Sequence, residues 1–367
     1  MFCPLPFTEL RIRGEGDCFI CCPQWNNFKS IGNVFETPNL EEIWNSDVAR
    51  EIRRSMFDQS FRFCNMDLCQ VKKERYTDGF TEEYMERGPT FIALNYDPSC
   101  NLFCKMCRDK KFMLSRHKQL KLIEFQDNLL ESKYFQDTGL INVTSNGDPF
   151  ASNVFWDLFQ KLTPKKFPKL KLRVRTHGLG LTPKNWKRLG EARRMMSELW
   201  ISIDAATEPT YNIIRRGGKF DLLTNNLEFL MSIKPEFKFS LALHYIVQRE
   251  NYHEVPAFVD FCERYQADII WFAKVYQGVD MSPEDLKLAA VHRPDHPLHQ
   301  DFLQVMRHPN VFNPRIDWTN MAQFVDTDPN GCQKSVRSNA LPVLNLPNAL
   351  PNVANSNDSS SQLKSLN

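Results

Sequence analysis

The sequence predicts an α/β fold, a partial (β/α)6 barrel preceded by a small cysteine-rich unit. Between residues 90 and 275, short apolar runs of β type alternate with amphipathic stretches of helical length. This alternation is typical of parallel βαβ units. Six repeats suit a partial barrel, whose functional residues lie where the strands end. Of the eleven cysteines, all but Cys262 and Cys332 fall in the first 107 residues, which sets the N-terminal part of the chain apart.

Residues 1–72 are expected to form a separate short unit. A strand at 11–13 is predicted to enter a glycine-rich turn, and a second strand then leads to Cys21. A helix is predicted to begin at Leu40 with Asn39 as its N-cap, because asparagine side chains accept hydrogen bonds from the free amides of a first helical turn. The charged segment 73–89 is expected to link this unit to the barrel.

The barrel is expected at residues 90–275. Its predicted strands span 90–96, 140–145, 171–176, 199–204, 239–247 and 268–272. The predicted helices between them include 120–130, 154–162, 183–194, 222–233 and 255–265. Residues 276–338, of weaker periodicity, are expected to form a C-terminal extension. Residues 339–367, rich in Asn, Ser, Pro and Leu, are expected to be a disordered tail.

The composition excludes several classes of function. The 46 basic and 44 acidic residues give a net charge of +2, so no basic excess favours nucleic acid or an anionic membrane surface as a partner. No run of about 18 apolar residues predicts a membrane-spanning helix, and the first residues lack the pattern of a signal peptide. We therefore expect a cytoplasmic protein, in which clustered cysteines indicate metal binding rather than disulfides.

The strongest candidate site is the loop after the first barrel strand. It carries Cys100, Cys104 and Cys107, and thiolates at this spacing can occupy three corners of an iron–sulfur cube. Three ligands for four irons leave one iron open to a cofactor or substrate, as catalytic metal sites do. The alternative is a zinc knuckle, but residues 108–110 supply no cysteine or histidine as a fourth ligand. We therefore predict an open [4Fe–4S] cluster on this loop.

Polar motifs follow the next predicted strands in turn. The segment Asn146, Gly147, Asp148 and Pro149 follows the second strand, Thr176 begins a Thr-His-Gly-Leu motif after the third, and Ser202 and Asp204 close the fourth. Arg215 lies in the segment after these residues. With the CxxxCxxC loop, this order of motifs resembles the radical SAM superfamily over most of residues 90–275.

The resemblance implies binding of S-adenosylmethionine and a role for each motif. The segment 146–149 would receive the methionine amino group, and Ser202 and Asp204 would hold the ribose hydroxyls. Arg215, or alternatively Arg216, would pair with the methionine carboxylate, because a guanidinium binds carboxylate with two parallel hydrogen bonds.

The cysteines of residues 1–72 form a second candidate site. They resemble the twitch or SPASM module of radical SAM enzymes, which holds auxiliary iron–sulfur clusters. The resemblance implies one auxiliary [4Fe–4S] cluster with four cysteine ligands: Cys3, Cys21, Cys64 and Cys69. Cys22 is the alternative to Cys21, and Cys18 is expected to be a bystander. Four thiolates suit zinc equally well, so a zinc ribbon stays open as a second interpretation.

Two functions of different class fit these features. A radical SAM enzyme would cleave S-adenosylmethionine with one electron from a donor such as flavodoxin or ferredoxin, and the 5′-deoxyadenosyl radical would take hydrogen from the substrate. That substrate would be a small metabolite, a sugar or a peptide, and the net reaction an oxidation or a cross-link. The alternative is a non-catalytic iron–sulfur or zinc-binding protein, which needs no site for S-adenosylmethionine. No catalytic side chain is predicted, and His292, His296 and His299 are expected to lie on a surface loop rather than to bind metal.

Overall fold

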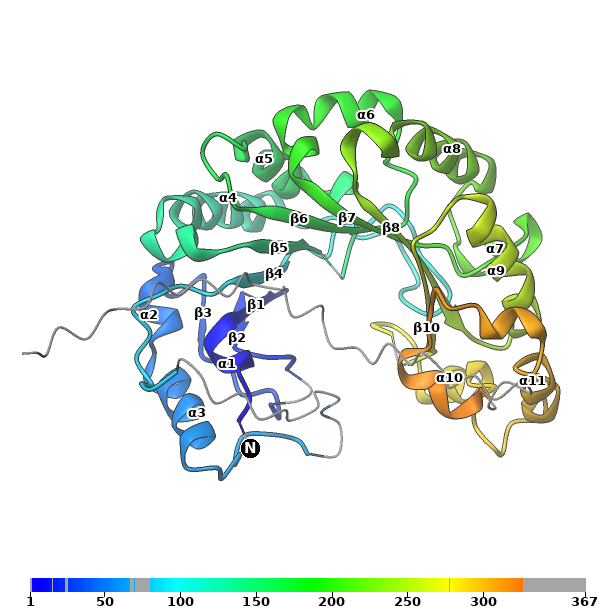
Figure 1. Cartoon of the computed structure of the whole chain (residues 1–367), viewed down its shortest axis with the longest axis horizontal. Helices are drawn as coiled ribbons and strands as arrows, with labels where there is room; N and C mark the ends of the chain where they lie inside the picture. Colours follow the sequence, from blue (N-terminus) through cyan, green and yellow to red (C-terminus); the bar gives the residue numbers. More distant parts are fainter. Residues whose placement is uncertain are drawn as a thin grey trace, which may run out of the picture.

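The computed structural model describes residues 2–14, 16–23, 26–66, 69, 80–144, 146–276 and 278–325. These residues form a ten-stranded sheet in the order β10-β9-β8-β7-β6-β5-β4-β1-β2-β3. Figure 1 shows that the sheet curves strongly and that helices cover its outer side. The predicted tail 339–367, parts of the predicted linker and C-terminal extension, and Cys332 lie outside the described residues.

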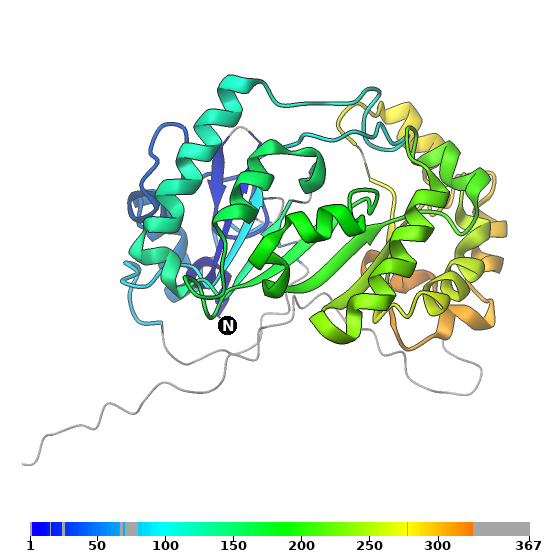
Figure 2. The same ribbon diagram turned by 90° about the horizontal axis from the view of Figure 1, so that it is seen from above.

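Six parallel strands make up the barrel, as predicted. They are β4 (Phe91–Asn95), β5 (Leu140–Val143), β6 (Lys171–Thr176), β7 (Met196–Ser202), β8 (Ser240–Val247) and β9 (Ile269–Lys274). Each pairs in parallel with the next along the chain. The helices of the outer layer are α4 (Arg116–Glu131), α5 (Asn153–Lys161), α6 (Pro183–Arg188), α7 (Glu208–Ile214), α8 (Phe220–Phe237) and α9 (Val255–Arg264). Figure 2 shows this layer from above. The strand–helix alternation therefore predicted the barrel correctly.

Short 3-10 helices also occur between the strands and α-helices of the barrel. They are η1 (Lys133–Asp137), η2 (Pro149–Ala151), η3 (Gly190–Met195) and η4 (Tyr252–Glu254). The prediction of one helix over 183–194 is wrong in this respect, because α6 ends at Arg188 and η3 follows. The reason is local: Gly190 has a φ of +59°, a left-handed conformation that interrupts an α-helix.

The two faces of the barrel sheet differ in chemistry. Side chains such as Leu94, Val174 and Leu243 belong to the main apolar core, and the helices pack against this outer face. Successive residues of a strand point to opposite faces, so Arg173 and His244 lie on the other side, which we call the inner face. The curvature of the sheet encloses the inner face (Figures 1 and 2).

The N-terminal unit extends the barrel sheet instead of standing apart from it. It comprises α1 (Leu5–Thr8), β1 (Glu9–Arg13), β2 (Asp17–Phe19), β3 (Gly32–Asn33), α2 (Leu40–Trp44) and α3 (Asp47–Phe57). Strands β1 and β2 form the predicted hairpin, and β1 also pairs in parallel with β4. Asn39 caps α2 as predicted, since its Oδ1 accepts a hydrogen bond from the amide of Glu41 at 2.9 Å. The structure thus joins to the barrel a unit that we expected to be separate.

A buried arginine of α3 holds the N-terminal unit together. The Arg53 side chain is inaccessible to solvent. Its guanidinium donates to the carbonyl oxygens of Pro6, Trp44 and Glu83 at 2.9, 2.8 and 3.0 Å, and to Oδ1 of Asn45 at 3.3 Å. Three segments far apart in the sequence therefore meet at this one side chain.

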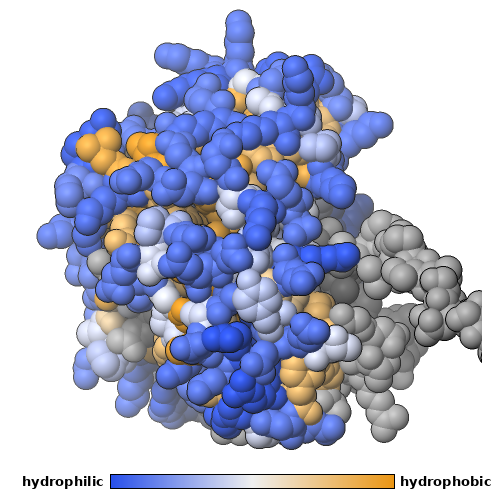
Figure 3. Space-filling view, turned by 90° about the vertical axis from the view of Figure 1, so that its left-hand side faces the viewer, coloured by the Kyte–Doolittle hydropathy of each residue, from blue (hydrophilic) through white to orange (hydrophobic). Residues whose placement is uncertain are grey.

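The C-terminal extension closes the other edge of the sheet. It contains α10 (Pro283–Ala289), α11 (His299–Val305), η5 (Pro309–Phe312), β10 (Ile316–Asp317) and η6 (Thr319–Phe324). Strand β10 pairs in parallel with β9, and the ring of Trp318 stacks on Phe272 with centroids 4.7 Å apart. In the part of the chain that the structure describes, no helix is long and apolar enough to cross a membrane. The side of the molecule beside α2 and α3 is mainly hydrophilic, with scattered apolar residues (Figure 3).

Candidate active site

The CxxxCxxC loop is fixed from both sides by backbone hydrogen bonds. Cys100 forms an isolated antiparallel bridge with Phe112. On the other side, the amides of Phe103 and Lys105 donate to the carbonyl oxygens of Arg216 and Ile214 at 3.1 and 2.9 Å. The loop is therefore held against the segment that carries the predicted carboxylate-binding arginine.

Burial differs among the three thiols of this loop. Cys104 is 7% exposed, whereas Cys100 and Cys107 are half-buried. Burial, with a smaller contribution from the charge of Asp148, raises the pKa of Cys100 to about 12. Burial also raises the pKa of Cys104, but the guanidinium of Arg215 opposes this shift. The positive charge beside Cys104 therefore favours the thiolate form that binds iron.

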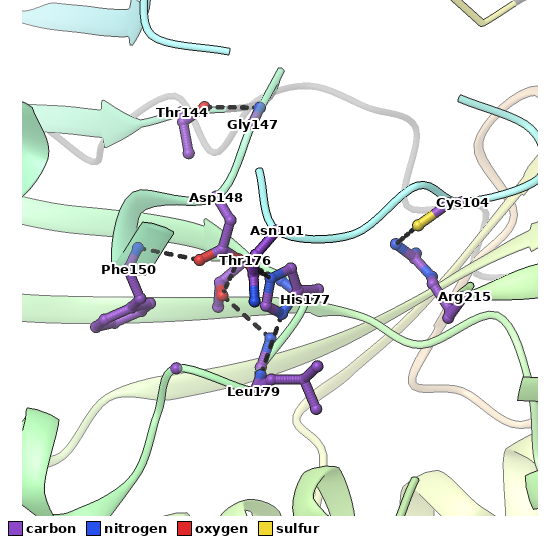
Figure 4. Close-up of polar contacts among 12 residues, drawn as sticks. Asn101, Cys104, Thr144, Gly147, Asp148, Phe150, Thr176, His177, Leu179 and Arg215 are labelled. Atoms are coloured by element: carbon purple, nitrogen blue, oxygen red, sulfur yellow. Dashed lines mark hydrogen bonds and ion pairs between the residues drawn. The ribbon is translucent and has the colours of Figure 1, made fainter. Parts of the chain in front are cut away.

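Arg215 joins the cysteine loop to the end of β7. One of its terminal nitrogens donates to Sγ of Cys104 at 3.6 Å, a contact that Figure 4 shows. Another lies 2.5 Å from Oδ2 of Asp204. Asp204 is inaccessible to solvent, and its Oδ1 accepts a hydrogen bond from the amide of Ile246 at 2.7 Å. Two of the predicted site residues thus form a buried ion pair.

Asp148 ties the ends of β5 and β6 together. Its Oδ2 accepts hydrogen bonds from Oγ1 of Thr176 at 2.5 Å and from the amide of His177 at 2.9 Å. The imidazole of His177 in turn lies 2.8 Å from Oδ1 of Asn101 in the cysteine loop. Figure 4 shows these side chains converging. Asp148 is only 1% exposed, so in this structure its carboxylate braces the site, and its contact with a methionine amino group stays a prediction.

Gly147 allows the β5 loop to approach the cysteine loop closely. A Cβ at this position would lie 2.7 Å from the carbonyl oxygen of Ser99 and 2.8 Å from that of Asp97. Its amide donates to Oγ1 of Thr144 at 3.2 Å (Figure 4). Any larger residue would push the two loops apart. Steric exclusion of a side chain therefore explains why this position of the second motif is a glycine.

Two residues that position the site, Arg108 and Asn251, were not predicted from the sequence. Arg108 follows the third cysteine and donates to the carbonyl oxygens of Pro98 and Asn146 at 2.7 and 3.0 Å. Asn251 donates to the carbonyl oxygen of Asp204 at 2.9 Å. The sequence carries a signal only for Arg108, through its place directly after Cys107. Nothing local marks Asn251.

The donors present fit an iron–sulfur cluster and a polar cofactor. The loop offers three thiols, and unpartnered buried polar atoms lie near the same strand ends. Among the described residues these include Oδ1 of Asn95, Nε of Arg215 and both side-chain amide atoms of Gln248. Buried polar groups normally find partners, so these atoms are consistent with a polar ligand. Of the other predicted site residues, Ser202 ends β7 and is half-buried. Pro149 begins η2.

The N-terminal cysteines also lie near one another. Burial raises the pKa of Cys3 to about 12, and the nearby thiols of Cys64 and Cys69 add to this shift. Burial likewise raises the pKa of Cys21, with a contribution from Cys3. Cys3 therefore lies near each of the other three predicted ligands, Cys21, Cys64 and Cys69. Cys18, in contrast, is a fully buried member of the apolar core.

Two of the three histidines expected on a surface loop of the C-terminal extension, His292 and His299, contact the ring of Phe324. The expected surface loop is wrong for His299, which is 9% exposed and begins α11. A ring nitrogen of His296 lies 3.1 Å from the carbonyl oxygen of Leu288, and one of His299 lies 2.9 Å from that of Val291. Within the described ranges, no three acidic, histidine or cysteine side chains converge on a single ion position. An iron–sulfur cluster does not need such convergence, because each of its thiolates binds a different iron.

Comparison with known proteins identifies the N-terminal unit. A family model described as an iron–sulfur cluster-binding domain, SPASM, matches residues 3–71. This confirms the predicted SPASM-like module, and its description names iron–sulfur chemistry rather than a zinc ribbon. No curated protein matches the sequence.

Solved structures resemble the chain at low identity. SuiB of Streptococcus suis bound to the precursor peptide SuiA is 14% identical with a TM-score of 0.38, over 68% of this chain and 58% of SuiB. TYW1 with a lysine-pyruvate adduct is 15% identical with a TM-score of 0.35, over 59% of this chain and 69% of TYW1. Native anSMEcpe with bound AdoMet is 16% identical with a TM-score of 0.42, over 59% of this chain and 57% of anSMEcpe.

The matches cover only part of each solved chain. The chain covers less than two thirds of the length of SuiB and of anSMEcpe. The family model, in contrast, matches residues 3–71 of this chain directly. The contact between Arg215 and Cys104 is likewise observed in this chain. The chain therefore carries a SPASM-type iron–sulfur cluster-binding domain in residues 3–71, joined to a parallel α/β barrel whose strand ends carry motifs that resemble those of the radical SAM superfamily.

Proposed function

We propose that this protein is a radical SAM enzyme that cleaves S-adenosylmethionine reductively and removes hydrogen from a small-molecule or peptide substrate. The observation that carries the proposal is the network Cys104–Arg215–Asp204, with contacts of 3.6 and 2.5 Å. It connects the cysteine loop to the strand end where the cofactor's ribose is expected. A carrier of iron–sulfur clusters would need no such connection.

Each residue of the network has a task in this proposal. Cys100, Cys104 and Cys107 would hold the [4Fe–4S] cluster, and Arg215 would hold the methionine carboxylate while its charge is balanced by Asp204. The half-buried Ser202 and the backbone near Asp204 would bind the ribose. When bound, the cluster and S-adenosylmethionine would supply the carbon radical that an unactivated C–H bond requires.

The protein's own contribution is orientation and shielding from water. The Asp148 brace and the close approach at Gly147 fix the β5 loop against the cysteine loop. Preorganised loops of this kind keep a reactive species within reach of its target. The SPASM-type domain would hold an auxiliary [4Fe–4S] cluster on Cys3, Cys21, Cys64 and Cys69, able to accept an electron from the substrate. An oxidation or a cross-link is then the expected net reaction.

Anaerobic cleavage of S-adenosylmethionine tests the proposal. The reconstituted, dithionite-reduced protein should form 5′-deoxyadenosine, measured by liquid chromatography, and Cys104→Ala should reduce the yield to background. Cys262→Ala is the matched control, because Cys262 is a fully buried core residue of α9 and its loss should leave the yield unchanged. Parent-level 5′-deoxyadenosine from Cys104→Ala would refute the proposal and favour a non-catalytic iron–sulfur protein.

A further inference from the structure

The inner face of the barrel carries two guanidinium groups on β6, those of Arg173 and Arg175. Parallel pairing places Arg173 opposite Glu198, and Arg175 opposite Trp200. Arg173 and Glu198 form two parallel hydrogen bonds at 2.8 and 2.9 Å. This pairing neutralises Arg173. The next guanidinium along β6 has no such partner.

Arg175 lacks an acidic partner among the described residues. Its Nε donates to Oδ1 of Asn142 at 3.2 Å, and its guanidinium lies over the ring of Trp200, 4.1 Å from the centroid. Neither contact balances its charge. Burial, together with the charges of Arg173 and Arg11, lowers the pKa of Arg175. A guanidinium in such surroundings stays charged and favours an anion beside it.

An aromatic stack continues from Arg175 across β7, β8 and β9. The ring of His244 packs edge-on against Trp200 with centroids 4.7 Å apart, and lies flat on Trp271 at 4.5 Å. His244 is 5% exposed, and its Nε2 has no hydrogen-bond partner among the described residues. A buried ring nitrogen without a partner is uncommon in a folded protein. It provides a second, independent indication that a polar ligand belongs here.

The location is adjacent to the proposed cofactor site. The carbonyl oxygen of His244 accepts hydrogen bonds from the amides of Ile203 and Asp204 at 3.0 and 3.3 Å. Asp204 is in turn the partner of Arg215. A ligand at Arg175 and His244 would therefore border the strand end where the radical is expected to form.

We propose that Arg175 binds an oxyanion of the substrate, a carboxylate or a phosphate, with the Trp200–His244–Trp271 stack as the adjoining wall. That the bound anion is the substrate rests on the proposed function. The binding site itself stands on the unbalanced guanidinium and the unpartnered imidazole nitrogen. This site requires an anionic substrate and excludes one that presents only neutral groups to the inner face.

Calorimetric titration of the reconstituted protein, saturated with S-adenosylmethionine, tests the inference. The probes are phenylacetate, phenyl phosphate and the neutral phenylacetamide. One of the two anions should bind and the amide should not; the stronger anion distinguishes a carboxylate from a phosphate. Arg175→Met should weaken anion binding by about tenfold to 150-fold, the loss expected for hydrogen bonds to a charged group. His244→Phe keeps the stack but removes Nε2, and should weaken binding less.

The matched control is Arg188→Met. Arg188 also lies over a tryptophan, 4.0 Å from the ring of Trp156, but in the outer helical layer, so anion binding should be unchanged. Equal binding of amide and anions, or unchanged binding in Arg175→Met, overturns the inference. So does anion binding that appears only in the protein free of S-adenosylmethionine, because this would assign the guanidinium to the cofactor. Because calorimetry does not depend on cofactor cleavage, anion binding without 5′-deoxyadenosine formation would overturn only the proposed function.

Discussion

Asp204→Ala should destabilise the fold as well as the proposed cofactor site. The carboxylate is inaccessible to solvent and lies 2.5 Å from the guanidinium of Arg215, whose side chain is 10% exposed. Removing one partner of a buried ion pair leaves an uncompensated charge, at a cost of about 3–5 kcal/mol in the free energy of unfolding. The amide of Ile246 would also lose its acceptor.

Variants at Asp204 and Arg215 separate these contributions. Asp204→Asn keeps an acceptor for the Ile246 amide but removes the charge, so it should cost less than Asp204→Ala by the value of that hydrogen bond, about 1–3 kcal/mol. In Asp204→Ala/Arg215→Met no buried charge is left, and replacing a buried ion pair by apolar groups is often close to neutral. The double variant should therefore be more stable than Asp204→Ala alone.

Urea denaturation of the metal-free protein, followed by far-UV circular dichroism, measures the cycle. Glu83→Gln is the control, because Glu83 pairs with Arg54 at 2.6 Å on the surface; its midpoint should not move measurably. Additive effects of Asp204→Ala and Arg215→Met would refute the reasoning, since they would show that the two side chains do not interact in the folded protein.

Three further predictions concern the rest of the molecule. The reconstituted protein should hold about eight irons by colorimetric assay, falling to about four in Cys64→Ala/Cys69→Ala; a stoichiometry of four in the parent, with zinc in place of the rest, would contradict the auxiliary cluster. Arg53→Met should lower the free energy of unfolding by about 3–5 kcal/mol because four acceptors, three of them buried, lose their donor. Its exposed neighbour Arg54→Met should have little effect in the same urea denaturation. Burial, with the nearby charges of Lys274 and Arg293, lowers the pKa of His292 to about 4, so the stability that its neutral form contributes is fully present above about pH 6.5 and is lost as pH falls towards 4. His292→Asn should flatten this part of the stability–pH curve, and an unchanged slope would show that His292 is not the group responsible.

The sequence alone was sufficient for the barrel and for the cysteine loop. Strand and helix periodicity are local properties, and six strands were predicted close to their observed bounds. The cap at Asn39 and the three-thiol spacing are equally local. Each depends on residues within a few positions of one another, which is why a single sequence reveals them.

Only the tertiary structure decided how these parts combine. The pairing of β1 with β4 joins residues about eighty positions apart, and no local pattern specifies a partner strand at that separation. The sequence predicts that Asp204 holds the ribose, and this stays a prediction. Its burial and its ion pair with Arg215, in contrast, depend on how β7 and the segment after α7 meet. Arg173 and Arg175 alternate with Leu172 and Val174 in the sequence, a pattern of any strand with one polar face. In the folded protein the sheet curves so that this polar face lies inside, where Arg175 contacts Trp200 and Trp200 contacts the buried His244. No single strand determines this arrangement, because the closure of a barrel depends on all its strands together.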